Sequence, residues 1–315
     1  MSRRSRLGPE PLQQRARRWA RRWARRWLPW TVAGTALMAC CASAHDTWFE
    51  RHPSFTPTLP VMVLGTGNQY PVFDSRNDLG SLVDSGCQAG GHIQRGLVER
   101  DPQSAALTLS TPRPLPAAPR LNCWARFQPF EVELPDALVE AYFKEAMPPA
   151  AVRQAWAAQK ARGQPWRERY VKQARLDWFS GAPEATAAPA APAATAATAA
   201  GTLVPLVPLE QGLDALLLQP LRAARVGDEL EFQVYKDGKP LPNFSVEFRL
   251  QTSRMGWWRR TDDQGRVRLR PPAAGAWLLR GIELTPPPPG STPPLWQGQF
   301  ITLAFEVQAS GTPGP

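Results

Sequence analysis

The sequence is poor in the residues and motifs that most often mark catalysis. It contains only three histidines among 315 residues. It also lacks a Gly-x-Ser-x-Gly turn, a His-Glu-x-x-His helix and a glycine-rich phosphate loop. These absences exclude the hydrolases, zinc proteases and nucleotide-binding enzymes that such motifs identify. We therefore expect a protein that is not an enzyme.

Acidic side chains are almost missing from the start of the chain, and this biases the net charge. The whole chain carries a formal charge of +10, but ten arginines and a single acid, Glu10, give residues 1–44 a charge of +9. About +1 therefore remains for the rest of the chain. A nearly neutral chain lacks the basic surface that binds phosphate backbones, so we expect no nucleic-acid partner.

The first 44 residues have the order of a secretory signal peptide. An arginine-rich region precedes the uncharged apolar run 28–42, which is shorter than the about 20 residues of a transmembrane helix. Cleavage after Ala44 would release a periplasmic protein with no membrane span. In the alternative, the lipobox-like Leu37-Met38-Ala39-Cys40 directs acylation of Cys40 and tethers the protein to a membrane.

Two β-rich regions follow, at 45–180 and 203–308. An Ala/Pro/Thr-rich linker, 181–202, separates them, and 309–315 is expected to be a disordered tail. Short alternating strands with regular turn signals indicate immunoglobulin-like sandwiches. The predicted fold class is mainly β, with two immunoglobulin-like β-sandwich domains, the first carrying a helical insertion.

The helical insertion is predicted over 135–179. Asp136 can cap a first helix through 137–144, and a second is expected around 152–156. A third is predicted over 166–175, because Glu168 and Lys172 have the favourable i, i+4 order of charges.

Cysteine is scarce after the export signal. Cys40 and Cys41 lie within the signal, so only Cys87 and Cys123 remain in the exported chain. An even pair in an exported protein predicts a disulfide, and a thiolate metal site is the alternative.

All three histidines lie in the first half of the exported chain. Signal cleavage would make His45 its first residue, whose α-amine and imidazole can together chelate a metal ion. The reference pKa of such an amine is about 7.7, so the metal displaces a loosely held proton. His52 and His92 are the candidate further ligands for Ni(II) or Cu(II), and Asp46 and Glu50 the auxiliary oxygen ligands.

Several segments together resemble the exported proteins of domain-of-unknown-function family 4198, which is sometimes labelled a nickel-uptake substrate-specific region. The matching segments include Ala44-His45-Asp46-Thr47-Trp48-Phe49-Glu50, Arg167-Glu168-Arg169-Tyr170-Val171-Lys172, Asp237-Gly238-Lys239-Pro240-Leu241 and Gly275-Ala276-Trp277.

The resemblance implies a periplasmic protein that handles nickel, cobalt or copper without catalysis. Its partner would be a metal-uptake transporter or an outer-membrane receptor. Members of the family often carry a further histidine after the Gly-x-Trp strand, where this chain has Arg280-Gly281-Ile282. Without this histidine, the resemblance gives weaker support for a complete metal site in this chain.

Two other functions remain open from the sequence. The first is a protein–protein interaction module that binds no metal. The second is an oxidative copper enzyme built on an N-terminal histidine, which would need a second histidine to complete its site. Loss of function on changing His45 would favour metal handling over the interaction module.

Overall fold

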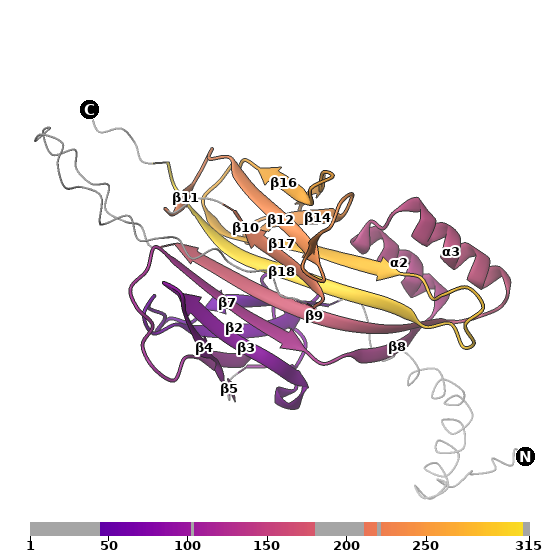
Figure 1. Cartoon of the computed structure of the whole chain (residues 1–315), viewed down its shortest axis with the longest axis horizontal. Coiled ribbons are helices and arrows are strands. Elements are labelled where there is room, and N and C mark those ends of the chain that lie inside the picture. Colours follow the sequence, from indigo (N-terminus) through magenta and orange to yellow (C-terminus); the bar gives the residue numbers. More distant parts are fainter. Residues whose placement is uncertain (1–44, 102–103, 180–210, 219–221, 311–315) are drawn as a thin grey trace, which may run out of the picture. The chain divides into compact units, whose positions relative to one another are not determined.

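The computed structural model describes residues 45–101, 104–179, 211–218 and 222–310 (Figure 1). Strands dominate these residues and build three sheets. The predicted mainly β fold class is confirmed. The predicted export signal, Cys40, the 181–202 linker and the start of the 203–308 region lie outside the described residues.

The N-terminal sheet has four antiparallel strands in the order β1-β2-β6-β5. These are β1 (Asp46–Arg51), β2 (Val61–Gly67), β6 (Leu107–Ser110) and β5 (Leu97–Arg100). Between β2 and the next strand the chain forms a loop and the short 3-10 helix η1 (Leu79–Ser81).

The central sheet has ten strands, with the main order β15-β14-β17-β18-β9-β7-β3-β4. They are β15 (Gly256–Arg260), β14 (Ser245–Leu250), β17 (Gly275–Thr285), β18 (Trp296–Gln308), β9 (Trp166–Phe179), β7 (Arg120–Phe127), β3 (Leu82–Ala89) and β4 (His92–Arg95), with β8 (Phe130–Leu134) beside β9 and β11 (Ala224–Arg225) beside β18.

The C-terminal sheet is built around β12, which pairs with three other strands. Its members are β10 (Leu213–Leu217), β12 (Leu230–Lys236), β13 (Lys239–Pro240) and β16 (Arg266–Leu269). Asp237 and Gly238 both have positive φ in the turn between β12 and β13, as the Asp-Gly hairpin signal predicts.

The central sheet runs through both halves of the chain. Its strands β9 and β18 pair in parallel, with Ala174 opposite Thr302, although β9 precedes residues 180–210 and β18 follows them. The two β-rich regions of the sequence therefore share one sheet.

Both faces of the central sheet are covered. On β17, Trp277 and Leu279 join the core that contains Phe232 of the C-terminal sheet. The intervening Leu278 belongs to the core around Trp48 of the N-terminal sheet. Because successive side chains of a strand point to opposite faces, the two smaller sheets pack on opposite sides of the central one (Figure 1).

Two helices, α2 (Asp136–Ala146) and α3 (Ala150–Ala161), confirm the first two predicted helices. Asp136 was expected to cap α2, but Pro135 occupies the N-cap position, and Asp136 instead forms an ion pair with Lys160 of α3 at 3.1 Å. The helices cover a third core in which Trp166 and Trp296 stack with ring centroids 4.2 Å apart.

The third predicted helix is wrong, because residues 166–179 form strand β9. Their many charged side chains resemble a solvated helical face. Several of them are nevertheless buried, and each of these has a polar partner. Arg175 forms an ion pair with Asp214 at 2.5 Å, and Glu168 accepts hydrogen bonds from Tyr142 and Trp166. Tertiary pairing thus overrides the local helical pattern.

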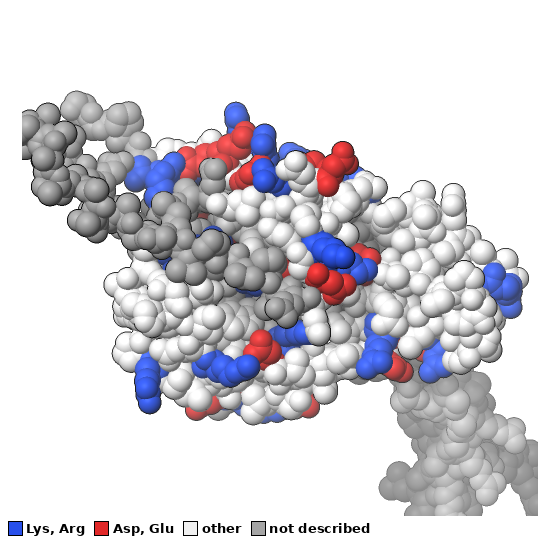
Figure 2. All heavy atoms as spheres, in the orientation of Figure 1, with Lys and Arg blue, Asp and Glu red and all other residues white. Residues whose placement is uncertain are grey.

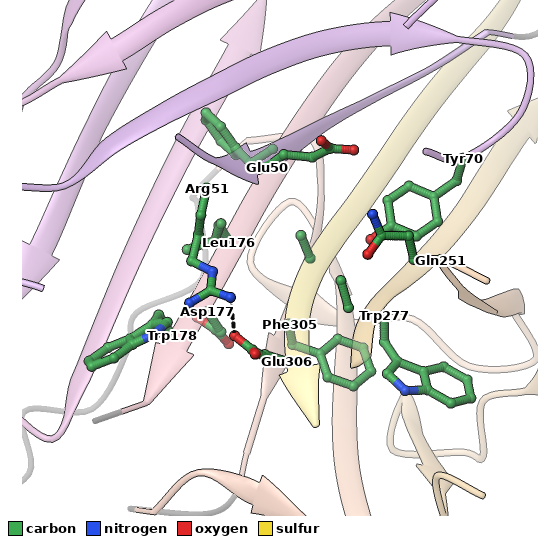
Figure 3. A pocket seen from close by; sticks show the side chains of 13 residues that line it. Glu50, Arg51, Tyr70, Leu176, Asp177, Trp178, Gln251, Trp277, Phe305 and Glu306 are labelled. Carbon is green, nitrogen blue, oxygen red and sulfur yellow. Dashed lines mark ion pairs between the residues drawn. The ribbon is translucent and has the colours of Figure 1, made fainter. Parts of the chain in front are cut away.

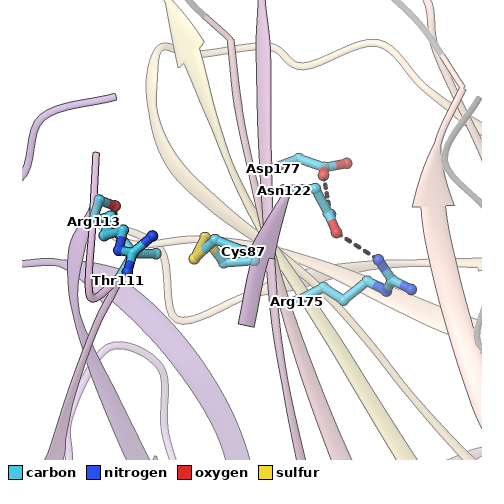
Figure 4. Close-up of a disulfide and its surroundings, with 7 residues drawn as sticks. Cys87, Thr111, Arg113, Asn122, Arg175 and Asp177 are labelled. Carbon is cyan, nitrogen blue, oxygen red and sulfur yellow. Dashed lines mark hydrogen bonds between the residues drawn. A yellow bond between two sulfur atoms is a disulfide. The ribbon is translucent and has the colours of Figure 1, made fainter. Parts of the chain in front are cut away.

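The predicted disulfide between Cys87 and Cys123 is confirmed (Figure 4). The two cysteines face each other on neighbouring strands β3 and β7. Beside them Asn122 donates a hydrogen bond to Asp177 and accepts one from Arg175. The disulfide thus lies beside a buried polar cluster of the central sheet.

Candidate functional site

His45 lies immediately before β1 and faces a carboxylate that is distant in sequence. Its Nε2 is 3.5 Å from Oδ1 of Asp74, and the two side chains are 17% and 38% exposed. The pair is therefore partly shielded from water while still open to a small solute.

Asp74 is held in place by its own loop. Its Oδ2 accepts hydrogen bonds from the backbone and side-chain nitrogens of Asn68, and its Oδ1 accepts one from Ser75. The preceding Phe73 packs on Trp48 of β1 with ring centroids 5.1 Å apart. This packing fixes the loop against the strand that carries His45.

Asp46, expected as an auxiliary metal ligand, has a different partner. Its Oδ2 lies 2.9 Å from Nη1 of Arg280, and both side chains are less than 10% exposed. Arg280 also donates to the backbone oxygen of Glu145, and its Nε lies 3.6 Å from Glu247. Asp46 therefore anchors the start of β1 to the central sheet.

A buried amine lies near Asp46. Burial lowers the pKa of Lys172 to about 8, and the negative charge of Asp46 opposes this shift. The ammonium nitrogen lies 5.7 Å and 5.9 Å from the ring centroids of Tyr170 and Phe300. Its positive charge is therefore held by aromatic faces and by the field of Asp46.

The other predicted metal ligands do not gather around His45. Glu50 lies five positions further along the extended chain, about 16 Å away, and His52 lies seven positions further, about 23 Å away. His52 makes a local contact with Ser54, and the exposed His92 contacts the backbone oxygen of Gly90. Among the described residues, no three His, Cys, Asp or Glu side chains are placed to hold one metal ion.

Glu50 instead faces a cavity at the other end of β1 (Figure 3). Nε1 of Trp48 donates a hydrogen bond to its Oε1 at 3.2 Å. Burial raises the pKa of Glu50, and this hydrogen bond partly opposes the shift.

Asp74 and Arg280 were not predicted as part of this region. The alternation along β1 shows that one face of the strand is buried, but it carries no information about which loop lies against His45. For Arg280 the family resemblance gave only a partial signal, because it pointed to the stretch that begins there as one without an expected histidine. The structure shows that this position lies beside Asp46, next to His45 in the chain.

Basic and acidic side chains are interleaved on the face drawn in Figure 2. On the C-terminal sheet, for example, Arg268 pairs with Glu231 at 3.0 Å and Arg270 with Glu229 at 2.9 Å.

In the part of the chain that the structure describes, no helix is long and apolar enough to cross a membrane.

Comparison with curated proteins finds no match. Among solved structures, one similar chain is the full ectodomain (Ig1–Ig3) of mouse nectin-like molecule 4, with 10% identity over 86% of this chain and 67% of that chain. Its TM-score of 0.18 is too low to carry an argument. Residues 141–282 match the model of a family described as a domain of unknown function, DUF4198. Over this stretch the chain is similar to that family.

Proposed function

We propose that the exported chain begins at His45 and binds a transition metal ion, nickel, cobalt or copper, in the periplasm as a non-catalytic step of metal uptake. The observation that carries this proposal is the contact between Nε2 of His45 and Asp74. A metal-uptake transporter or an outer-membrane receptor would be the partner.

The chelate uses the two nitrogens that an N-terminal histidine offers on one residue. The α-amine and Nδ1 can bind the same ion and close a ring through Cα, Cβ and Cγ. This mode assigns the remaining ring proton to Nε2, which then donates to Asp74. A carboxylate on the second ring nitrogen is the usual partner of a metal-ligating histidine, because it fixes the tautomer and raises the basicity of the ligand.

The surrounding structure keeps this residue in position. The residue after His45 is tied to Arg280 and pairs with Gly67 of β2. The metal would therefore meet a backbone that is already ordered, and less conformational entropy is lost on binding.

The test begins with intact mass and N-terminal sequencing of the exported protein, followed by titration with Ni(II) and Cu(II). We expect one ion per chain, with binding abolished in His45→Ala. Acetylation of the N-terminus should also abolish chelation, because it keeps the imidazole but blocks the amine. Asp74→Asn should weaken binding by about 10- to 100-fold.

His92→Ala is the matched control, since that histidine is exposed on β4 and should leave the affinity unchanged. A chain acylated at Cys40, or one that starts at His45 and binds neither metal, would overturn the proposal. Equal affinity with and without N-terminal acetylation would exclude the amine as a ligand.

A further inference from the structure

A second feature of β1 lies at the end opposite His45. There the strand crosses the central sheet beside a cavity of about 170 Å³, which is lined by residues of β1, β9, β17 and β18 and by Tyr70 and Gln251 from loops (Figure 3). Typical pockets for drug-sized ligands are larger, about 300–1,000 Å³, so this cavity suits a smaller molecule.

The cavity contains more negative than positive charge. Glu50, Glu306 and Asp177 line it together with one cation, Arg51. Asp177 is already paired with Arg120, and Arg51 forms an ion pair with Glu306 at 2.6 Å. The charge of Glu50 is therefore left without a cationic partner among the described residues that line the cavity.

Glu50 also retains hydrogen-bonding capacity. Only its Oε1 accepts a hydrogen bond from a described residue, namely from Trp48. Burial and the nearby charges of Glu50 and Glu306 raise the pKa of Tyr70, so its phenol stays protonated beside both carboxylates. Three oxygen-bearing side chains thus line the same cavity.

The remaining walls are aromatic or small. Tyr70 and Trp178 contribute rings, and Ala276 and Ala304 contribute short side chains that leave room between the strands. Aromatic faces attract cations and also pack against aliphatic carbon. Carboxylates and rings around a small space together favour a positively charged group on a short aliphatic chain.

We propose that this cavity binds a small organic cation, a primary ammonium on a short aliphatic chain, with Glu50 as its principal anionic partner. The ammonium has three protons to donate, which matches the oxygens of Glu50, Glu306 and Tyr70. The proposal does not depend on the metal site, because about 16 Å of strand separates Glu50 from His45.

The test is calorimetric titration of the exported chain with n-butylammonium, in the presence of EDTA so that metal plays no part. Neutral n-butanol and anionic butyrate have similar size and serve as ligand controls. We expect n-butylammonium to bind at millimolar concentration and both controls to bind more weakly.

Two variants should change the affinity in opposite directions. Glu50→Gln should weaken binding at least about tenfold, the effect of losing one charge-assisted hydrogen bond. Arg51→Gln should strengthen it by about two- to fivefold, because it releases the exposed carboxylate of Glu306 from its internal partner. Glu131→Gln, at an exposed position on β8, should have no effect.

Absence of n-butylammonium binding to the unaltered chain would overturn the proposal, as would equal binding of n-butanol. Tighter binding of butyrate would show that Arg51 makes this an anion site. If Glu50→Gln leaves the affinity unchanged while its circular dichroism matches the parent, the cation binds elsewhere.

Discussion

The buried ion pair between Arg175 and Asp214 gives the sharpest test of the fold. Nε and Nη2 of the guanidinium lie 2.5 Å and 2.6 Å from the two carboxylate oxygens, and the side chains are only 3% and 0% exposed. Arg175 is on β9 and Asp214 on β10, on either side of residues 180–210. The pair thus joins the central sheet to the C-terminal sheet.

Asp214→Asn keeps the size of the side chain but removes its charge. An uncompensated guanidinium then remains in a site that excludes water, and breaking such a pair costs about 3–5 kcal/mol of unfolding free energy. Replacing both partners, with Arg175→Met and Asp214→Leu, should cost less than the single change, because no buried charge is left.

Urea denaturation of the chain from His45 onward measures these differences by linear extrapolation. Arg268→Met is the matched control, because its pair with Glu231 is on the surface, where an ion pair contributes less than about 1 kcal/mol. A cost for Asp214→Asn as small as that of the control would refute the reasoning and show that water reaches Arg175.

Two further changes test the core beneath the helices. Burial raises the pKa of Glu168 to about 7, although Trp166 and Tyr142 donate hydrogen bonds that oppose this. The folded chain therefore holds a proton that the unfolded chain releases, so stability should be highest below pH 4.5 and fall by roughly 3 kcal/mol as the pH rises past 7. Urea melts at pH 5 and pH 8 should show this fall, and Glu168→Gln should remove it; an unchanged slope in the variant would contradict the assignment. Gly298→Ala should cost about 1–3 kcal/mol in the same melts, because the added Cβ would collide with the carboxylate of Glu168. A loss under about 0.5 kcal/mol would mean that Glu168 can move aside.

The strands of the C-terminal half could be predicted because local pattern and burial agree there. Residues 230–236 and 245–250 alternate polar and apolar side chains, and the Asp237-Gly238 turn fixes the register between neighbouring strands. Helices α2 and α3 were predictable for the same reason, since their apolar residues recur at helical spacing.

Strand β9 could not be predicted because its polar residues are buried. Periodicity assumes that a charged side chain faces water, whereas Glu168, Arg175 and Asp177 each find a partner on another element. The pairing of β9 with β18 likewise joins segments that are far apart in sequence, and no local signal specifies it.

The sequence could predict which type of residue the candidate site contains, but not which residues the fold brings together. A histidine that follows a predicted cleavage site can be proposed as a chelating residue wherever the chain folds, so His45 could be named without a structure. Asp74 could not, because its place beside His45 depends on how one loop packs. Glu50 was expected near the same metal, yet the extension of β1 carries it to the opposite end.

The two ends of β1 are nevertheless connected through Trp48. Its fully buried ring packs on Tyr70 and Phe73, with ring centroids 5.6 Å and 5.1 Å away, and its Nε1 bonds to Glu50. The loop that Trp48 holds supplies Asp74 to the histidine and Tyr70 to the cavity. Changes at Asp74 or Glu50 should therefore affect one proposed site each, whereas a change at Trp48 would disturb both. This dependence on one buried side chain explains how a single strand can position two separate sites.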